Sequence, residues 1–199
     1  MNLLGHAFLS FGDAEVLCGN MMGDFVKGKK ALETYPPKIK QGLMLHRKID
    51  SFTDNHPAVK DAKQFFRADY RLYAGAITDV LFDHFLANDP RYFENETQLK
   101  VFTNKVFVQL KATQSHQTDI FRKLALHLEK EQVLNRFRTI TGLRTAIHKL
   151  CKRMFYPLDE MKAYESTMNN YEILNQHYKL FIDDVILFAK KELGMRIED

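Results

Sequence analysis

The sequence contains only two cysteines, Cys18 and Cys151, and neither belongs to a Cys-x-x-Cys pair. A disulfide framework and a sulfur-rich zinc site are therefore both poorly supported. Any bound metal ion would depend on histidine and carboxylate ligands. Such ligands suit manganese, iron, magnesium or zinc rather than an ion that selects thiolates.

Signals for membrane insertion and export are also absent. No apolar run approaches the roughly 20 residues that a membrane-spanning helix needs. The N-terminal stretch MNLLGHAFLSFGDAE has no basic start ahead of its short apolar run, so a signal peptide is not expected. We expect a cytoplasmic protein with no membrane partner.

Several widespread catalytic signatures are missing. The chain has no GxxxxGK[ST] loop, no GxGxxG after a strand, no HExxH and no GxSxG. These absences argue against nucleoside-triphosphate hydrolysis and against a serine hydrolase.

The 199 residues, 45% of them hydrophobic and 27% charged, suit one globular domain with a proper core. Apolar residues recur at spacings of three and four almost throughout, which predicts an all-helical protein. Asp13 caps a first helix over 14–26, and Pro37 opens the next, which extends to about residue 52. Further helices are expected over 57–67, 73–87, 96–114, 117–128, 131–137, 139–154 and 157–193, the last broken near Asn169 and Asn170.

The predicted helix over 73–87, YAGAITDVLFDHFLA, is apolar almost all round but carries Asp79 and Asp83 four residues apart. Burying ionised carboxylates without a partner costs several kcal/mol each. Because this helix has no Lys or Arg of its own within one turn, the acids require positive charge from elsewhere or a raised pKa. A metal ion would supply that charge, and Arg47 or Lys48 would be the alternative.

Two other predicted helices present a polar pair beside an apolar stripe. His46 and Asp50 are one turn apart, and Asn20 and Asp24 have the same spacing. If these helix edges converge, they would bring nitrogen and oxygen ligands around one or two divalent ions, with further carboxylates orienting that shell. Each pair alone also has an ordinary structural explanation; Asp50, for example, would pair with Arg47 or Lys48 at a helix end.

The net charge is +4, and the Lys and Arg residues cluster at 27–30, 136–144 and 149–153. Such clusters favour an anionic partner, although each is also compatible with a solvated face.

With these residues in view, the chain resembles the acyl carrier protein phosphodiesterase family, also called acyl carrier protein hydrolase. The matching segments are MNLLGHAFLS, GNMMGDFVKG, HRKIDSFTDNHPAV and AITDVLFDHFLA, which follow in the expected order within residues 1–87. The family is similar to the HD-type metal-dependent phosphohydrolases. The resemblance therefore implies an all-α, single-domain HD-like helical bundle, with the motifs in residues 1–90 and a helical scaffold in 91–199.

The resemblance further implies a divalent-metal enzyme of fatty acid metabolism that removes the 4′-phosphopantetheine arm from holo acyl carrier protein. Manganese is the expected ion, with magnesium or iron as alternatives. The expected metal ligands are His6, His46, Asp50 and Asp79. One departure from HD-type enzymes is that His46 is followed by Arg47, so the chain lacks an adjacent His-Asp dipeptide.

The remaining roles follow from the same chemistry. Asp24 or Asp83, whichever is not a ligand, would be the general base, and Arg47 would stabilise charge on the phosphoryl group. Acyl carrier proteins are small and acidic, and Lys27, Lys29 and Lys30 directly follow the Asp24 helix, so they are the expected docking residues.

Two other functions remain open from the sequence. One is an HD-like phosphohydrolase of a nucleotide or another small diester. The other is a non-catalytic helical binding module whose basic clusters bind nucleic acid, with the acids paired to Arg47, Lys48 or Arg71. A pI near 8.9 and the lack of a nucleic-acid-binding motif count against the second. The oligomeric state is open, and the 16 Phe and 8 Met residues could line an apolar channel or form a dimer face.

Overall fold

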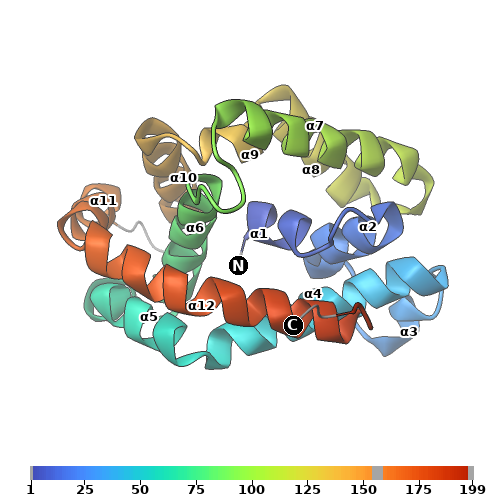
Figure 1. Ribbon diagram of the computed structural model, residues 1–199, viewed down its shortest axis with the longest axis horizontal. Coiled ribbons are helices and arrows are strands. Elements are labelled where there is room, and N and C mark those ends of the chain that lie inside the picture. Colours follow the sequence, from blue (N-terminus) through green and yellow to red (C-terminus); the bar gives the residue numbers. More distant parts are fainter. Residues whose placement is uncertain (1, 154–158, 197–199) are drawn as a thin grey trace.

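The computed structural model describes residues 2–153 and 159–196, and within these ranges all regular secondary structure is helical (Figure 1). The predicted all-α class is confirmed. The first half of the chain forms α1 (Leu3–Phe8), α2 (Ala14–Met22), η1 (Gly23–Phe25), α3 (Lys29–Leu32), α4 (Pro37–Asn55), α5 (Pro57–Tyr70), η2 (Arg71–Tyr73) and α6 (Ala74–Ala87). The second half forms α7 (Glu96–Ala112), η3 (Gln114–His116), α8 (Asp119–Lys130), α9 (Val133–Arg136), α10 (Ile140–Arg153), α11 (Glu160–Asn169) and α12 (Tyr171–Glu192).

The predicted caps set most of the helix boundaries. Asp13 caps α2 by accepting the backbone N–H groups of Glu15 and Val16, each at 3.1 Å. Pro37 and Pro57 occupy the first turns of α4 and α5, where a missing N–H costs nothing. Asn170 separates α11 from α12, which confirms the expected break.

One predicted helix needs revision, and two short helices were not predicted. The helix expected over 14–26 is wrong at its C-terminal end, because residues 23–25 tighten into the 3-10 turn η1. Neither α1 nor α3 was expected, since helices of six and four residues are too short to be stable by themselves. The expected helix ends at Met154 and Pro157 lie outside the described residues.

The helices form two sides around α1 and α2 (Figure 1). On one side α12 packs along α4 and α5, and on the other α7 packs on α2. Helix α6 contacts α1, α5 and α10, so it joins both sides. Large aromatic side chains fill this core, and Phe66, Phe82, Phe121 and Phe181 are fully buried. Part of the phenylalanine content is therefore used for packing.

Helices α2 and α4 cross at a pair of glycines. A Cβ atom on Gly19 would lie 2.1 Å from the carbonyl oxygen of Ile39, and one on Gly42 would lie 2.2 Å from that of Val16. These contacts are possible only because neither residue has a side chain. The crossing fixes Asn20 of α2 relative to His46 of α4.

No helix within the described ranges combines the length and apolar character needed to cross a bilayer.

Candidate metal and active site

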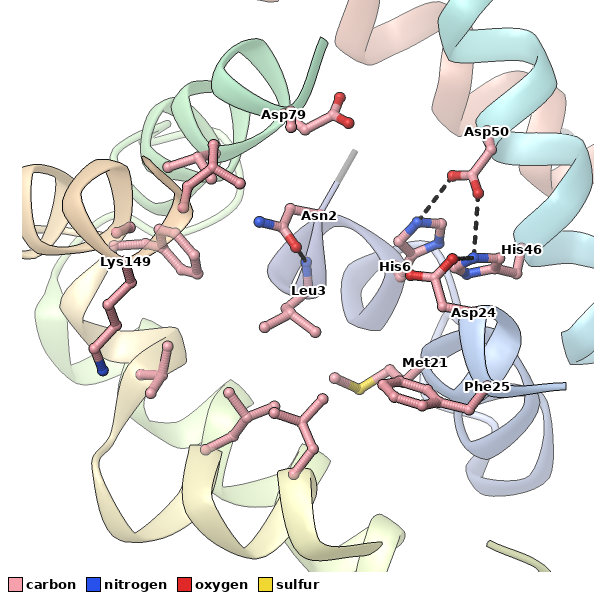
Figure 2. A pocket seen from close by; sticks show the side chains of 18 of the residues that line it. Asn2, Leu3, His6, Met21, Asp24, Phe25, His46, Asp50, Asp79 and Lys149 are labelled. Carbon is pink, nitrogen blue, oxygen red and sulfur yellow. Dashed lines mark hydrogen bonds and ion pairs between the residues drawn. The ribbon is translucent and has the colours of Figure 1, made fainter. Parts of the chain in front are cut away.

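Three of the predicted metal ligands meet at one point. One ligand atom each from His6, His46 and Asp50 lies within 4.8 Å of the others. The Asp50 carboxylate is 3.2 Å from Nε2 of His6 and 3.1 Å from Nε2 of His46 (Figure 2). The two imidazole rings are stacked, with centroids 4.2 Å apart. Helix α1 therefore contributes one candidate ligand and α4 contributes two, and His46 and Asp50 lie on the same face of α4.

A single residue, Asn20, orients both rings. Its side-chain oxygen Oδ1 lies 2.9 Å from Nδ1 of His6, and its backbone oxygen lies 2.7 Å from Nδ1 of His46. The Asn20 amide nitrogen donates to the backbone oxygen of His6 and to Ser10 Oγ, which leaves Oδ1 facing the imidazole. Both Nδ1 atoms therefore donate, and a neutral ring would present its Nε2 lone pair to Asp50.

Two lone pairs facing a carboxylate repel it, so this cluster requires a positive charge. Burial is the largest influence on His46 and opposes protonation, but contacts with Asp24 and Asp50 outweigh it and raise the pKa of His46 to about 9. Burial lowers the pKa of His6. Burial would raise the pKa of the Asp50 carboxyl, but the contacts with both histidines hold it well below its usual range. The raised pKa of His46 favours a proton on that ring, which would supply the positive charge when no metal ion is bound.

The same arrangement suits a divalent ion. Metal-bound histidines normally present one ring nitrogen to the ion and donate the other N–H to an oxygen, as both rings do here. Two imidazole nitrogens and a carboxylate leave coordination positions for water or substrate. The residues present therefore fit a catalytic rather than a closed structural metal site.

Asp24 lies at the edge of this cluster. It belongs to η1, its side chain is exposed, and Oδ1 is 3.3 Å from Nε2 of His46. The contact with His46 lowers the pKa of the Asp24 carboxyl. An ionised carboxylate next to the ligand cluster is well placed to accept a proton from a bound water.

Asp79 lies on α6 and lines the same cavity, on the wall opposite Asp50 (Figure 2). Its side chain is half-buried. Among the described residues, the close group of ligand atoms contains the two histidines and Asp50 but not Asp79. Asp79 therefore lines the same cavity but does not belong to the cluster of His6, His46 and Asp50.

Asp83 occupies a different environment. Its fully buried carboxylate accepts the backbone N–H groups of Leu4, Gly5 and Asn2 at 2.8, 3.0 and 3.3 Å. Burial raises the pKa of Asp83 to about 7, although these N–H donors favour the ionised form. Asp83 therefore caps α1 from a distant part of the chain and is absent from the described cavity lining. The structure separates it from the cluster, so a base at this position has no geometric support.

The predicted cations also point elsewhere. The Arg47 guanidinium donates to the backbone oxygen of Val26 at 2.8 Å, and Lys48 pairs with Glu192. Neither lines the cavity that holds the cluster, within the part of the chain that is described. Lys27, Lys29 and Lys30 are exposed in the segment that follows η1.

The cavity beside the cluster has a volume of about 520 Å³. His6, Asp24, His46 and Asp50 lie together on one side, Asp79 faces them from α6, and His127 and Lys149 also line the cavity (Figure 2). The remaining wall is mostly apolar and is contributed largely by the second half of the chain, through Leu124, Leu128, Val133, Phe137, Ala146 and Leu150. The site can therefore accept an elongated ligand with an anionic group at one end and a less polar remainder.

Sequence reasoning missed three residues that shape the site. The Oγ1 atom of Thr53 lines the cavity, is buried and has no hydrogen-bond partner among the described residues. Asn20 was expected only as part of a polar pair, and its bonds to both rings could not be foreseen. Gly23 packs directly under His46, since a Cβ atom there would lie 2.2 Å from Cγ of the imidazole. A glycine immediately before Asp24 in GNMMGD was the available signal.

We expect Gly23→Ala to weaken Mn²⁺ binding roughly 10- to 100-fold, because the new methyl group displaces the His46 ring from Asp50. Isothermal titration calorimetry on the metal-stripped variant measures this effect. Gly75→Ala is the matched control, since a Cβ atom there meets only the flexible end of Lys63 at 3.4 Å. Equal affinities for the two variants would contradict the placement of His46 in the metal site.

Comparison with known proteins gives a consistent result. A family model described as acyl carrier protein phosphodiesterase matches residues 1–185. Proteins of that name include one from Pectobacterium atrosepticum, 29% identical over 181 residues, covering 91% of this chain and 90% of the relative. One from Yersinia pestis is 30% identical over 188 residues, covering 94% of this chain and 93% of the relative. One from Salmonella agona is 31% identical over 153 residues, covering 77% of this chain and 79% of the relative.

No solved structure matches the chain significantly, so the HD-like relation stays a prediction. The match extends well beyond residue 90 and includes the apolar cavity wall.

Proposed function

The chain belongs to the acyl carrier protein phosphodiesterase family, and we propose that it is a metal-dependent enzyme that converts holo to apo acyl carrier protein. The family and the names of its relatives give the general activity, hydrolysis of a phosphoric diester with acyl carrier protein as substrate. Metal dependence and release of the 4′-phosphopantetheine arm are the specific parts of the proposal. Cytoplasmic location and a place in fatty acid metabolism remain predictions.

The observation that carries the proposal is the cluster of His6, His46 and Asp50 on one side of a partly apolar cavity. A phosphodiester is anionic and needs positive charge beside its oxygens. The pantetheine arm is elongated and uncharged beyond its phosphate. The cluster and the apolar part of the cavity wall match these two parts of the substrate.

A divalent ion held by His6, His46 and Asp50 would activate water near neutral pH and offset charge on the phosphoryl oxygens. Asp24 accepts the proton of the attacking water. The water oxygen forms a bond to phosphorus, and the bond between phosphorus and the serine oxygen of the carrier breaks. The leaving serine oxygen takes up a proton from solvent, and Asp24 releases its proton to solvent. The products are apo carrier protein, with its serine hydroxyl restored, and free 4′-phosphopantetheine.

Other residues assist this reaction. Asn20 keeps both Nε2 atoms directed at the metal position by holding each Nδ1–H. Asp79 faces the same space and is proposed as the ligand of a second ion. Manganese is the ion we expect, and magnesium or iron would use the same nitrogen and oxygen ligands.

The decisive experiment incubates metal-stripped protein with holo acyl carrier protein, with and without Mn²⁺, and measures the intact mass of the carrier. We expect loss of the phosphopantetheine mass only when Mn²⁺ is present. An unchanged mass despite clean Mn²⁺ binding would favour a phosphohydrolase of small diesters. Failure to bind any divalent ion would favour a non-catalytic binding module.

A further inference from the structure

We propose that a basic groove on α5, here called the α5 groove, docks the acidic carrier protein over the mouth of the cavity. This inference rests on the proposed function. The groove has a volume of about 630 Å³ and lies between α5 and the start of α6. Its lining includes Lys60, Lys63, Arg67, Arg71 and Leu72.

The α5 groove is continuous with the candidate active site. Asp54 lines both the groove and the cavity, and on α6 the groove reaches Gly75 while the cavity begins at Ala76. Asp54 follows Asp50 on α4 by four residues, which is a rise of about 6 Å. The edge of the groove at Asp54 therefore lies one helical turn from Asp50 of the cluster.

The proposed reaction requires the docking site of the carrier to lie close to the candidate metal site. The scissile phosphodiester is attached directly to a serine of the carrier, so the carrier surface itself must reach the mouth of the cavity. A docking site far from Asp50 would leave the phosphorus atom out of reach. The groove meets this condition because it shares a wall with the cavity.

The groove also carries positive charge that the protein does not neutralise. Lys63 pairs with Asp54 at 2.7 Å, but Lys60, Arg67 and Arg71 form no ion pair within residues 2–153 and 159–196. Uncompensated cations around a groove attract an acidic partner and increase its rate of association.

A second surface cleft on α4 shows a different pattern and therefore serves as a comparison. Its lysines are already neutralised, since Lys40 pairs with Glu33 at 2.7 Å and Lys48 pairs with Glu192. Of these two clefts, the α5 groove is therefore the one whose positive charge is available to a partner.

An apolar contact lies at the edge of the same groove. Arg71 adopts a positive φ of 43°, and the turn that follows leaves Leu72 95% exposed. An exposed leucine among arginines and lysines suits a partner with an apolar spot surrounded by acidic residues. The groove would therefore contact an acidic surface of the carrier, while Lys27, Lys29 and Lys30 remain the proposed contact near Asp24.

The test compares Arg67→Glu/Arg71→Glu with Lys100→Glu/Lys179→Glu, which makes the same change in net charge on exposed residues of α7 and α12. Binding of apo acyl carrier protein to each Mn²⁺-loaded protein is measured by calorimetry at low salt. We expect the groove variant to bind roughly tenfold more weakly or worse, and the control to bind like the unmodified protein. For the groove variant, kcat/KM for holo carrier protein should fall by the same factor as the binding affinity. Its kcat/KM for bis(p-nitrophenyl) phosphate should stay unchanged.

Each outcome has a definite meaning. Equal binding by the groove variant and the unmodified protein would overturn the docking site, and so would equal weakening in the control. The neutral variant Arg67→Gln/Arg71→Gln should show a smaller loss in the same direction. If apo carrier protein binds through Arg67 and Arg71 but the holo form is never cleaved, the docking site stands and the proposed function fails.

Discussion

Replacing Asp50 with alanine should abolish tight Mn²⁺ binding and lower cleavage of holo acyl carrier protein roughly 100- to 1,000-fold. The Asp50 carboxylate contacts Nε2 of both His6 and His46, so its loss removes the group that joins the two imidazoles. Two neutral nitrogens without a carboxylate bind a hard divalent ion weakly. Calorimetry reports the metal affinity, and the intact mass of the carrier reports cleavage.

Asp54→Ala provides the control for Asp50→Ala. Asp54 lies one turn further along α4, lines the same cavity and pairs with Lys63 rather than with a histidine. Its removal should change metal affinity by less than about threefold, as expected for an exposed ion pair. Equal losses in the two variants would show that general negative charge, rather than the cluster, governs metal binding.

Asp83→Ala should lower the free energy of unfolding by about 3 to 5 kcal/mol, because it removes an acceptor from three N–H groups at the start of α1. A six-residue helix cannot hold itself together, so α1 and its ligand His6 should detach locally. Urea denaturation measures the loss. Asp83→Asn keeps one acceptor oxygen at the same place and should lose less stability.

The same pair of variants separates a capping role from a catalytic one. If Asp83 only caps α1, folded Asp83→Asn should retain cleavage within about tenfold of the unmodified protein, which is less than the loss of a general base would cause. A stable Asp83→Asn protein with activity reduced about a thousandfold would instead restore Asp83 as the base.

Asp79 and Asp83 show which features of the site could be predicted from the sequence and which could not. A four-residue spacing predicts that two acids share a helix face, and burial predicts that each needs a partner. Neither pattern shows whether the partner is a metal ion, a cation or the N-terminus of another helix. For Asp83 the partners are N–H groups about 80 positions earlier in the chain, which only the tertiary structure reveals.

The helix pattern and the His46–Asp50 pair were more predictable, because both depend on local spacing. Caps and apolar periodicity determine where α4 begins and which of its faces is buried. Arg47 was misplaced for the opposite reason. A long, flexible side chain at an exposed position can reach acceptors on other elements. Arg47 donates to the backbone oxygen of Val26, and spacing along α4 does not predict that partner.

The candidate site is built from two structural units, one of which is the pair of helices α2 and α4 that cross at Gly19 and Gly42. Asn20, His46 and Asp50 belong to one block, because Gly19 and Gly42 bring its two backbones into direct contact. His6 belongs to the other, a short helix whose N-terminal N–H groups are held by the Asp83 carboxylate. An ion bound between His6 and Asp50 would bridge these parts and fasten the beginning of the chain to its core. Binding at the catalytic centre and the folding of the N-terminal segment are then thermodynamically linked, so each stabilises the other.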